Sequence, residues 1–196
     1  MDSLGKIIII VLLLPSMALA AVSYDADRKL YVDEQGRAAT GTFTKMMDGS
    51  FNHEYECFSD KAETTIYSGR AQKVLLYLKD TLILERTYSN MSQDWVNRRF
   101  HQNGRVSSVV SFRNGLPNGT SNYYTQDGRI KQSVNYSNGK LYGTARFYRT
   151  NGTLQFELIA RDGKYIYGIC VASTGTRRQL NSEELVTFGR IPPTCN

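Results

Sequence analysis

A repeat of 24 residues constrains the fold of this chain more than any other feature of its sequence. Three segments align as RFHQNGRVSSVVSFRNGLPNG (99–119), YYTQDGRIKQSVNYSNGKLYG (123–143) and FYRTNGTLQFELIARDGKYIYG (147–168). Six glycines keep this step in two sets, which are Gly104, Gly128, Gly152 and Gly115, Gly139, Gly163. A fixed period in this range predicts a stack of supersecondary units, none of which buries its apolar surface alone.

Each repeat predicts two antiparallel strands joined by tight turns. Asn-Gly and Asp-Gly pairs are strong turn signals, because glycine accepts a positive φ without a steric penalty. Between the turns, apolar and polar residues alternate, as in a strand with one buried face. The residues predicted for the buried face are Val106, Ser108, Val110, Phe112, Ile130, Val134, Tyr136, Leu154, Phe156 and Leu158. The predicted fold class is therefore all-β, an extended antiparallel meander of two-stranded repeats.

The N-terminal residues 1–20 do not belong to the repeats. An apolar run over residues 7–14 precedes small residues that fit a cleavage site after Ala20, which predicts a signal peptide and a periplasmic or secreted protein. The run is shorter than the roughly 20 residues that span a bilayer. An uncleaved N-terminal anchor is the alternative.

The rest of the chain is expected to form one domain, 21–196. We expect divergent repeats over 21–94, three regular repeats over 95–171 and a short irregular or helical cap over 172–196. In the cap, Asn181 or Ser182 can begin a short helix. Such a cap would cover the open end of the repeat array.

Three cysteines, Cys57, Cys170 and Cys195, follow the predicted signal peptide. An oxidising compartment favours a disulfide, and an odd count leaves one thiol over. The preferred pair is Cys170 with Cys195, because that bond would hold down the C-terminal tail. Cys57 would then be a buried apolar residue or a free thiol.

The stretch GTSNYYTQDGRIKQSVNYSNGKLYGTARFYRTNGTL (119–154) resembles the MORN-repeat variant of YwqK-type antitoxins. The shared pattern is an aromatic pair, Asn/Asp-Gly-Lys/Arg-aliphatic, an apolar strand and Asn-Gly-Lys-x-x-Gly. The resemblance covers residues 97–168 and returns in LYVDEQGRAATGTF (30–43). Asp80 stands where the pattern has glycine, which puts the turn there in question. The resemblance implies a β-repeat protein that neutralises a toxin.

The sequence holds no recognisable catalytic motif. The two histidines, His53 and His101, stand in unrelated contexts without metal-ligand spacing. Neither a nucleophile elbow nor a phosphate-binding loop occurs. The segment HEYEC (53–57) offers four potential metal ligands, but a strand would divide them between its two faces. We therefore predict a non-catalytic protein without cofactor or metal.

Aromatic residues are the better candidates for function. The chain has 13 Tyr and 8 Phe against one Trp, and tyrosine combines a rigid apolar ring with a polar tip. The predicted partner-binding residues are Arg99, Phe100, Tyr123, Tyr124, Arg146, Phe147 and Tyr148. The alternative is that one ring of each aromatic pair fills the core and the other stabilises a neighbouring strand.

The net charge of +6 indicates attraction to acidic surfaces, although the basic residues are scattered. No nucleic-acid-binding motif is present, and nucleic acid is not an expected partner. We expect an exported module that binds a protein partner, and the resemblance narrows this to an immunity or antitoxin role in the periplasm. The alternative is a cell-envelope scaffold that holds anionic lipid or polysaccharide weakly on its basic aromatic surface. A homodimer through the open sheet is also compatible with the sequence.

Overall fold

The computed structural model describes residues 22–89, 94–190 and 193–195, and the predicted signal peptide lies outside them. The described chain is nearly all β, its strands pair antiparallel, and its one α-helix lies near the C-terminus. The fold class predicted from the repeat is therefore confirmed. The chain divides into two compact units, Met1–Ser92 and Gln93–Asn196.

The first unit contains four antiparallel strands in the order β3-β6-β7-β8. Their bounds are Gly41–Met46 (β3), Lys61–Tyr67 (β6), Arg70–Leu78 (β7) and Thr81–Ser89 (β8). Two small hairpins accompany them, formed by Ser23–Asp25 (β1) with Leu30–Val32 (β2) and by Phe51–Asn52 (β4) with Cys57–Phe58 (β5). Val74 and Leu76 of β7 and Leu84 of β8 are buried, and Tyr55 and Cys57 of the second hairpin pack against them.

The turn at Asp80 forms without glycine. Lys79 and Asp80 join β7 to β8 with φ values of 50° and 57°, the same left-handed conformation that the Asn-Gly turns use. Aspartate is one of the few residues besides glycine that adopt this region readily. Asp80 therefore preserves the hairpin where the repeat pattern is broken.

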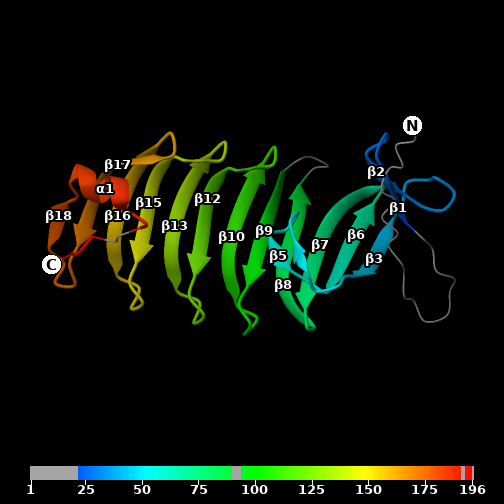
Figure 1. The fold of residues 1–196 in the computed structure, drawn as a ribbon, viewed down its shortest axis with the longest axis horizontal. Coiled ribbons are helices and arrows are strands. Elements are labelled where there is room, and N and C mark those ends of the chain that lie inside the picture. The colour runs from blue at the N-terminus through cyan, green and yellow to red at the C-terminus, as the bar shows by residue number, and fades with distance from the viewer. Residues whose placement is uncertain (1–21, 90–93, 191–192, 196) are drawn as a thin grey trace. The chain divides into compact units, whose positions relative to one another are not determined.

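The second unit has eight antiparallel strands in the order β9-β10-β12-β13-β15-β16-β17-β18 (Figure 1). Their bounds are Asp94–Phe100 (β9), Val106–Arg113 (β10), Gly119–Tyr124 (β12), Ile130–Ser137 (β13), Gly143–Tyr148 (β15), Leu154–Arg161 (β16), Lys164–Val171 (β17) and Arg177–Gln179 (β18). Two short strands, Leu116–Pro117 (β11) and Lys140–Leu141 (β14), pair with β10 and β13.

The buried side chains of this unit gather on one face, which we call the packed face. Cross-strand pairing connects Ser121 with Val134, Ala145 with Leu158, and Leu158 with Gly168. Val134, Ala145, Phe156 and Leu158 form the centre of the core, as the alternation predicted for three of them. Val106, Ile130 and Leu154 are only half-buried and lie beside β-bulges, whereas Val110, Phe112 and Tyr136 are half-buried in regularly paired parts of their strands.

Residues 172–179 continue the repeat, so the prediction that the cap begins at residue 172 is wrong. The loop 172–176 has the backbone hydrogen bonds of the repeat loops, and β18 then pairs with β17. The covering part of the cap begins at Asn181. Helix α1 (Ser182–Thr187) starts there with a capping box, in which Asn181 Oδ1 accepts from the Glu184 N–H and Glu184 Oε2 accepts from the Asn181 N–H.

The cap rests on the packed face. The Phe188 ring lies 5.0 Å from the rings of both Phe147 and Phe156, and 5.5 Å from that of Tyr165. A side chain at Gly168 would clash with Leu158 and press on Leu185, so glycine is what lets the helix approach the sheet here.

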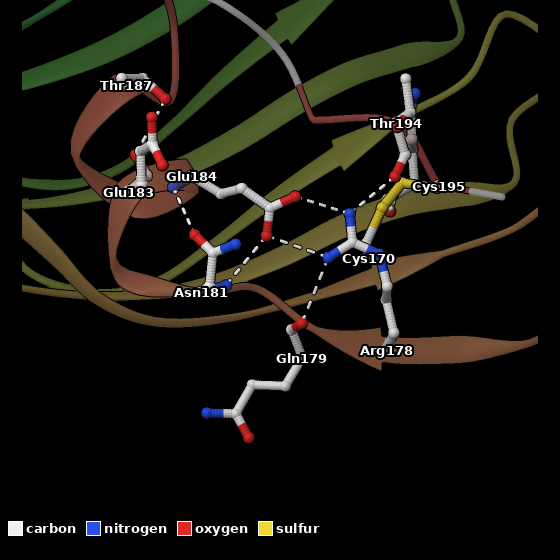
Figure 2. A network of polar contacts seen from close by, with 10 residues as sticks. Cys170, Arg178, Gln179, Asn181, Glu183, Glu184, Thr187, Thr194 and Cys195 are labelled. Atoms are coloured by element: carbon white, nitrogen blue, oxygen red, sulfur yellow. Dashed lines mark hydrogen bonds and ion pairs between the residues drawn. A yellow bond between two sulfur atoms is a disulfide. The ribbon is translucent and has the colours of Figure 1, made fainter.

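A disulfide joins Cys170 to Cys195, the pair that the sequence favoured, and Cys57 is partly buried and takes no part in this bond. Figure 2 shows Arg178 beside this bond, where its guanidinium donates to both carboxylate oxygens of Glu184 and to the Thr194 carbonyl. The tail is therefore held by one covalent bond and one charged network.

This network predicts an acid-sensitive cap. Hydrogen bonds from Arg178 and from the Asn181 backbone lower the pKa of Glu184 from 4.5 to about 2. Since the pKa is lower in the folded state, the carboxylate stabilises the cap above pH 4.5, and this contribution disappears as the pH falls toward 2. Replacement of Glu184 by Gln should lower the melting temperature at pH 7 and reduce the loss of stability between pH 4.5 and 2.

The matched control is Glu183→Gln, which removes an exposed carboxylate from the same helical turn. Thermal melts at several pH values should show this variant behaving like the wild type. Equal melting temperatures for the wild type and Glu184→Gln at pH 7 would contradict the assigned role of the network.

Candidate interaction surface

One edge of the second unit is built from a recurring five-residue loop. The loops 101–105, 125–129, 149–153 and 172–176 share two backbone hydrogen bonds, and 33–37 in the first unit has the same pair. In each loop the first N–H donates to the fifth carbonyl, and the fourth-place glycine donates to the first carbonyl. The glycine has a positive φ of 72–90° in every copy, which explains its strict recurrence.

Arginines connect successive loops of this edge. The Arg105 guanidinium donates to the Asp127 carbonyl at 2.6 Å, and that of Arg129 donates to the Thr150 carbonyl at 2.8 Å. Asn103 Nδ2 adds a bond to the Gln126 carbonyl at 2.8 Å. The basic residue that follows Asn/Asp-Gly in the repeat therefore holds one repeat to the next, and this edge is mainly structural.

The opposite edge is built from two-residue hairpin turns. Asn114-Gly115, Asn138-Gly139 and Asp162-Gly163 all have positive φ at both positions, which is the conformation of type I′ turns. The turns stack on one another, since Gly139 N–H donates to the Pro117 carbonyl and Gly163 N–H donates to the Leu141 carbonyl.

The third repeat carries one extra residue at this edge. Gly119 and Gly143 end the corresponding segments of the first two repeats with positive φ, whereas Gly168 comes one residue later and lacks it. The pairing of β16 with β17 shifts between Ile159 and Ala160, leaving Ile166 as the bulged residue. A bulge absorbs the insertion without ending the strand.

Three large apolar side chains of this edge are at least 48% exposed, and Tyr167, which follows Ile166, is 43% exposed. Leu116 is 48% exposed, Tyr142 56% and Ile166 49%, and the last two are separated by one repeat length. Leu116 lies against the next turn, with its Cδ2 3.4 Å from the position of a Cβ on Gly139. We call these three residues, with the exposed Lys140 and Lys164 beside them, the turn-edge patch.

The second unit also concentrates the positive charge of the chain. Residues 93–196 contain 14 Lys and Arg against 6 Asp and Glu, a net charge of +8, whereas residues 1–92 contain 10 against 12, a net charge of −2. A basic surface with exposed apolar side chains is suited to an acidic macromolecule, because charge speeds the encounter and apolar contact supplies affinity.

The residues predicted to bind a partner do not form one surface. Arg99, Tyr123 and Phe147 do lie in one row across the packed face, where Arg99 and Tyr123 both pair with Ser108 and Phe147 pairs with Gln132. Burial raises the pKa of the Tyr123 hydroxyl, and the neighbouring Tyr136 adds to the shift. Phe147 is covered by Phe188 of the cap. This row therefore belongs in large part to the core.

The other four candidates lie elsewhere. Arg146 is on the opposite face, where its Nε donates to Glu157 Oε2 at 2.7 Å. Phe100, Tyr124 and Tyr148 are half-buried where the strands reach the arginine-linked loops, opposite Val106, Ile130 and Leu154. The turn-edge patch was not predicted, although the one-repeat spacing of Tyr142 and Ile166 was a signal for it.

The described residues offer no arrangement typical of a metal centre. Within ranges 22–89, 94–190 and 193–195, no three His, Cys, Asp or Glu side chains gather closely enough to hold an ion. The ring of His53 packs against Phe51, and His101 Nε2 lies 3.0 Å from the Tyr124 carbonyl of the next repeat. In the same ranges no helix is long and apolar enough to cross a membrane.

Comparison with known proteins adds little to this description. No protein-family model matches the chain, and no curated protein matches it. A solved structure of a Staphylococcus aureus TarM mutant, in complex with fondaparinux, alpha-GlcNAc-glycerol and UDP, is similar over 54% of this chain, with a TM-score of 0.28 and 12% identity. The matched part is 19% of that TarM chain.

Proposed function

We propose that this protein is an exported, non-catalytic β-repeat module that binds an acidic protein partner through the turn-edge patch. The observation that carries the proposal is the patch itself, with Leu116, Tyr142 and Ile166 each about half exposed on a unit of net charge +8. Several exposed apolar residues of this size at one edge of a sheet are a feature of protein interfaces.

The partner is a secreted toxin, and the role is that of an immunity protein in the periplasm. The resemblance of residues 97–168 to YwqK-type antitoxins supports this narrower proposal. An inhibitor needs a rigid surface, because a preorganised surface loses little entropy on binding. The stacked type I′ turns meet that need, since each turn bonds to the next through a backbone N–H.

Growth rescue tests the immunity role. A secreted toxin encoded beside this protein should stop growth when expressed alone, and co-expression of this protein should restore it. The triple variant Leu116→Ser, Tyr142→Ser and Ile166→Ser should lose the rescue, because hot-spot residues of an interface typically weaken binding by ten- to a hundredfold or more when truncated. Immunoblotting should show both forms at equal levels in the periplasm.

The control for this variant is Val186→Ser, which removes an apolar side chain that is 85% exposed on α1 and outside the patch. It should rescue growth fully. Failure of the wild-type protein to rescue, or equal rescue by the triple variant, would refute the proposed role.

Sedimentation with anionic vesicles tests the scaffold alternative. The scaffold requires salt-sensitive binding to vesicles that contain phosphatidylglycerol, since each basic residue near the surface contributes about 1 kcal/mol at low salt. The proposed protein-binding role predicts that little of the protein sediments with them at physiological ionic strength. Extensive co-sedimentation that Lys140→Glu with Lys164→Glu abolishes would favour the scaffold instead.

A further inference from the structure

The first unit contains a pocket of about 270 Å³ that the turn-edge patch does not involve. Its lining includes Tyr24, Lys29 and Tyr31 of the β1–β2 hairpin, together with Gly69 of the β6–β7 turn, Arg70 of β7 and Tyr88 of β8. Pockets that bury drug-sized ligands span roughly 300–1,000 Å³. A ligand of this pocket is accordingly about the size of one monosaccharide.

Three tyrosines give the pocket aromatic walls with hydroxyl groups. The rings of Tyr24 and Tyr31 meet edge to face, 5.2 Å apart. Burial is the largest of the causes that raise the pKa of Tyr31 to about 12, and Glu54, Tyr88 and Tyr24 supply the rest of that shift. The Tyr31 hydroxyl is therefore protonated at neutral pH and keeps its proton for donation. Aromatic faces beside hydroxyl donors suit a ring that has both apolar C–H groups and polar substituents.

Two cations line the pocket, whereas Glu54, whose carboxylate acts on Tyr31, is not among its lining residues. Arg70 and Lys29 both line it, and Lys29 forms no ion pair within the part of the chain that the structure describes. An aromatic cage by itself would suit a quaternary ammonium ion. The guanidinium and ammonium groups oppose a cation here, and they favour a carboxylate or phosphate group.

The backbone around the pocket is firmly placed. Tyr31 N–H donates to the Gly69 carbonyl, and Gly69 N–H donates to the Ala39 carbonyl, both at 2.7 Å. Asp25 Oδ1 accepts from the backbone of Asp27 and Arg28, which fixes the turn that presents Lys29 with a φ of 53°. Gly69 has a φ of +74°, and a Cβ there would lie 3.0 Å from the Tyr31 carbonyl. Preorganised walls lower the entropic cost of binding a small ligand.

We propose that this pocket binds an anionic pyranose, a monosaccharide-sized ring that bears a carboxylate or phosphate group. The ring packs against the tyrosines, and the anionic group lies between Lys29 and Arg70. This site is independent of the proposed protein-binding role, because no residue of the turn-edge patch belongs to it.

Calorimetric titration of the full protein with four probes tests the site. Glucuronate and glucose 6-phosphate carry the two anionic groups, glucose is the neutral ring, and choline represents an occupant of an aromatic cage. Both anionic sugars should bind at least tenfold more tightly than glucose, since one charge-assisted contact is worth about that factor. If only one of them does, its anionic group is the one that the site accepts. Choline should bind more weakly than either.

Lys29→Gln should weaken binding of the anionic sugars about tenfold and leave glucose unchanged. Lys79→Gln is the matched control, because Lys79 is also an exposed lysine of the first unit with a left-handed φ of 50°. Tyr24→Ala should weaken the binding of all three sugars. Equal affinities for both anionic sugars and glucose, tighter binding of choline, or equal effects of Lys29→Gln and Lys79→Gln would overturn the proposal.

Discussion

Replacement of Leu158 by alanine should lower the free energy of unfolding of the second unit by about 2–5 kcal/mol. Leu158 is completely buried, pairs with Ala145 and Gly168, and lies in the cluster that the cap covers. Helix and sheet both pack around this side chain, and the space that it leaves cannot close without moving one of them. Partial relaxation therefore leaves a cavity and adds its cost to the lost burial.

Urea titration followed by tryptophan fluorescence measures this effect. Trp95 is the one tryptophan of the chain and stacks on Phe112 at 5.1 Å, so its emission reports on the second unit. The control is Ile159→Ala, the neighbouring residue on the opposite face, which is only half-buried and should cost about 1 kcal/mol. Equal losses in the two variants would show that the packed face is wrongly assigned.

Removal of the disulfide should destabilise the second unit by about 3 kcal/mol. The bond closes a loop with a sequence separation of 25 and holds the tail over the packed face. In Cys195→Ala, residues 193–195 lose this covalent attachment, and the network of Arg178 loses support for its contact with the Thr194 carbonyl. We expect a lower urea midpoint and faster proteolysis of the tail.

Reduction provides the control for this prediction. Dithiothreitol should lower the stability of the wild type to that of Cys195→Ala and leave the variant unchanged. A wild-type urea midpoint that does not respond to complete reduction, checked by mass spectrometry of alkylated thiols, would contradict the stabilising role of the bond.

The repeat made most of the second unit predictable. Alternation located the strands, and the Asn-Gly and Asp-Gly pairs located the turns, because only a few residues accept the φ values that type I′ turns require. The bulge at Ile166 follows from the extra residue of the third repeat, which is visible in the sequence. Helix α1 was indicated by its capping residue Asn181.

Some contacts and exposures depend on tertiary packing and could not be predicted from the sequence. In the sequence, Phe147 resembles the other aromatic candidates, but in the structure Phe188 packs on it and covers it. No local sequence pattern predicts a contact between residues so far apart in the chain. Arg105 and Arg129 were equally ambiguous, because an arginine after a turn is usually solvated, whereas here each one bonds to the next loop. The patch at Leu116, Tyr142 and Ile166 depends on exposure, which the alternation of a strand does not specify at a turn.

The most direct test of the proposed function is calorimetric titration of this protein with the toxin encoded beside it, at low and at physiological ionic strength. The wild type and Val186→Ser should bind saturably, with affinity that falls as salt screens the positive surface. The triple serine variant of Leu116, Tyr142 and Ile166 should bind at least tenfold more weakly at both salt concentrations. No binding by the wild type, or equal affinities for all three proteins, would contradict the proposal.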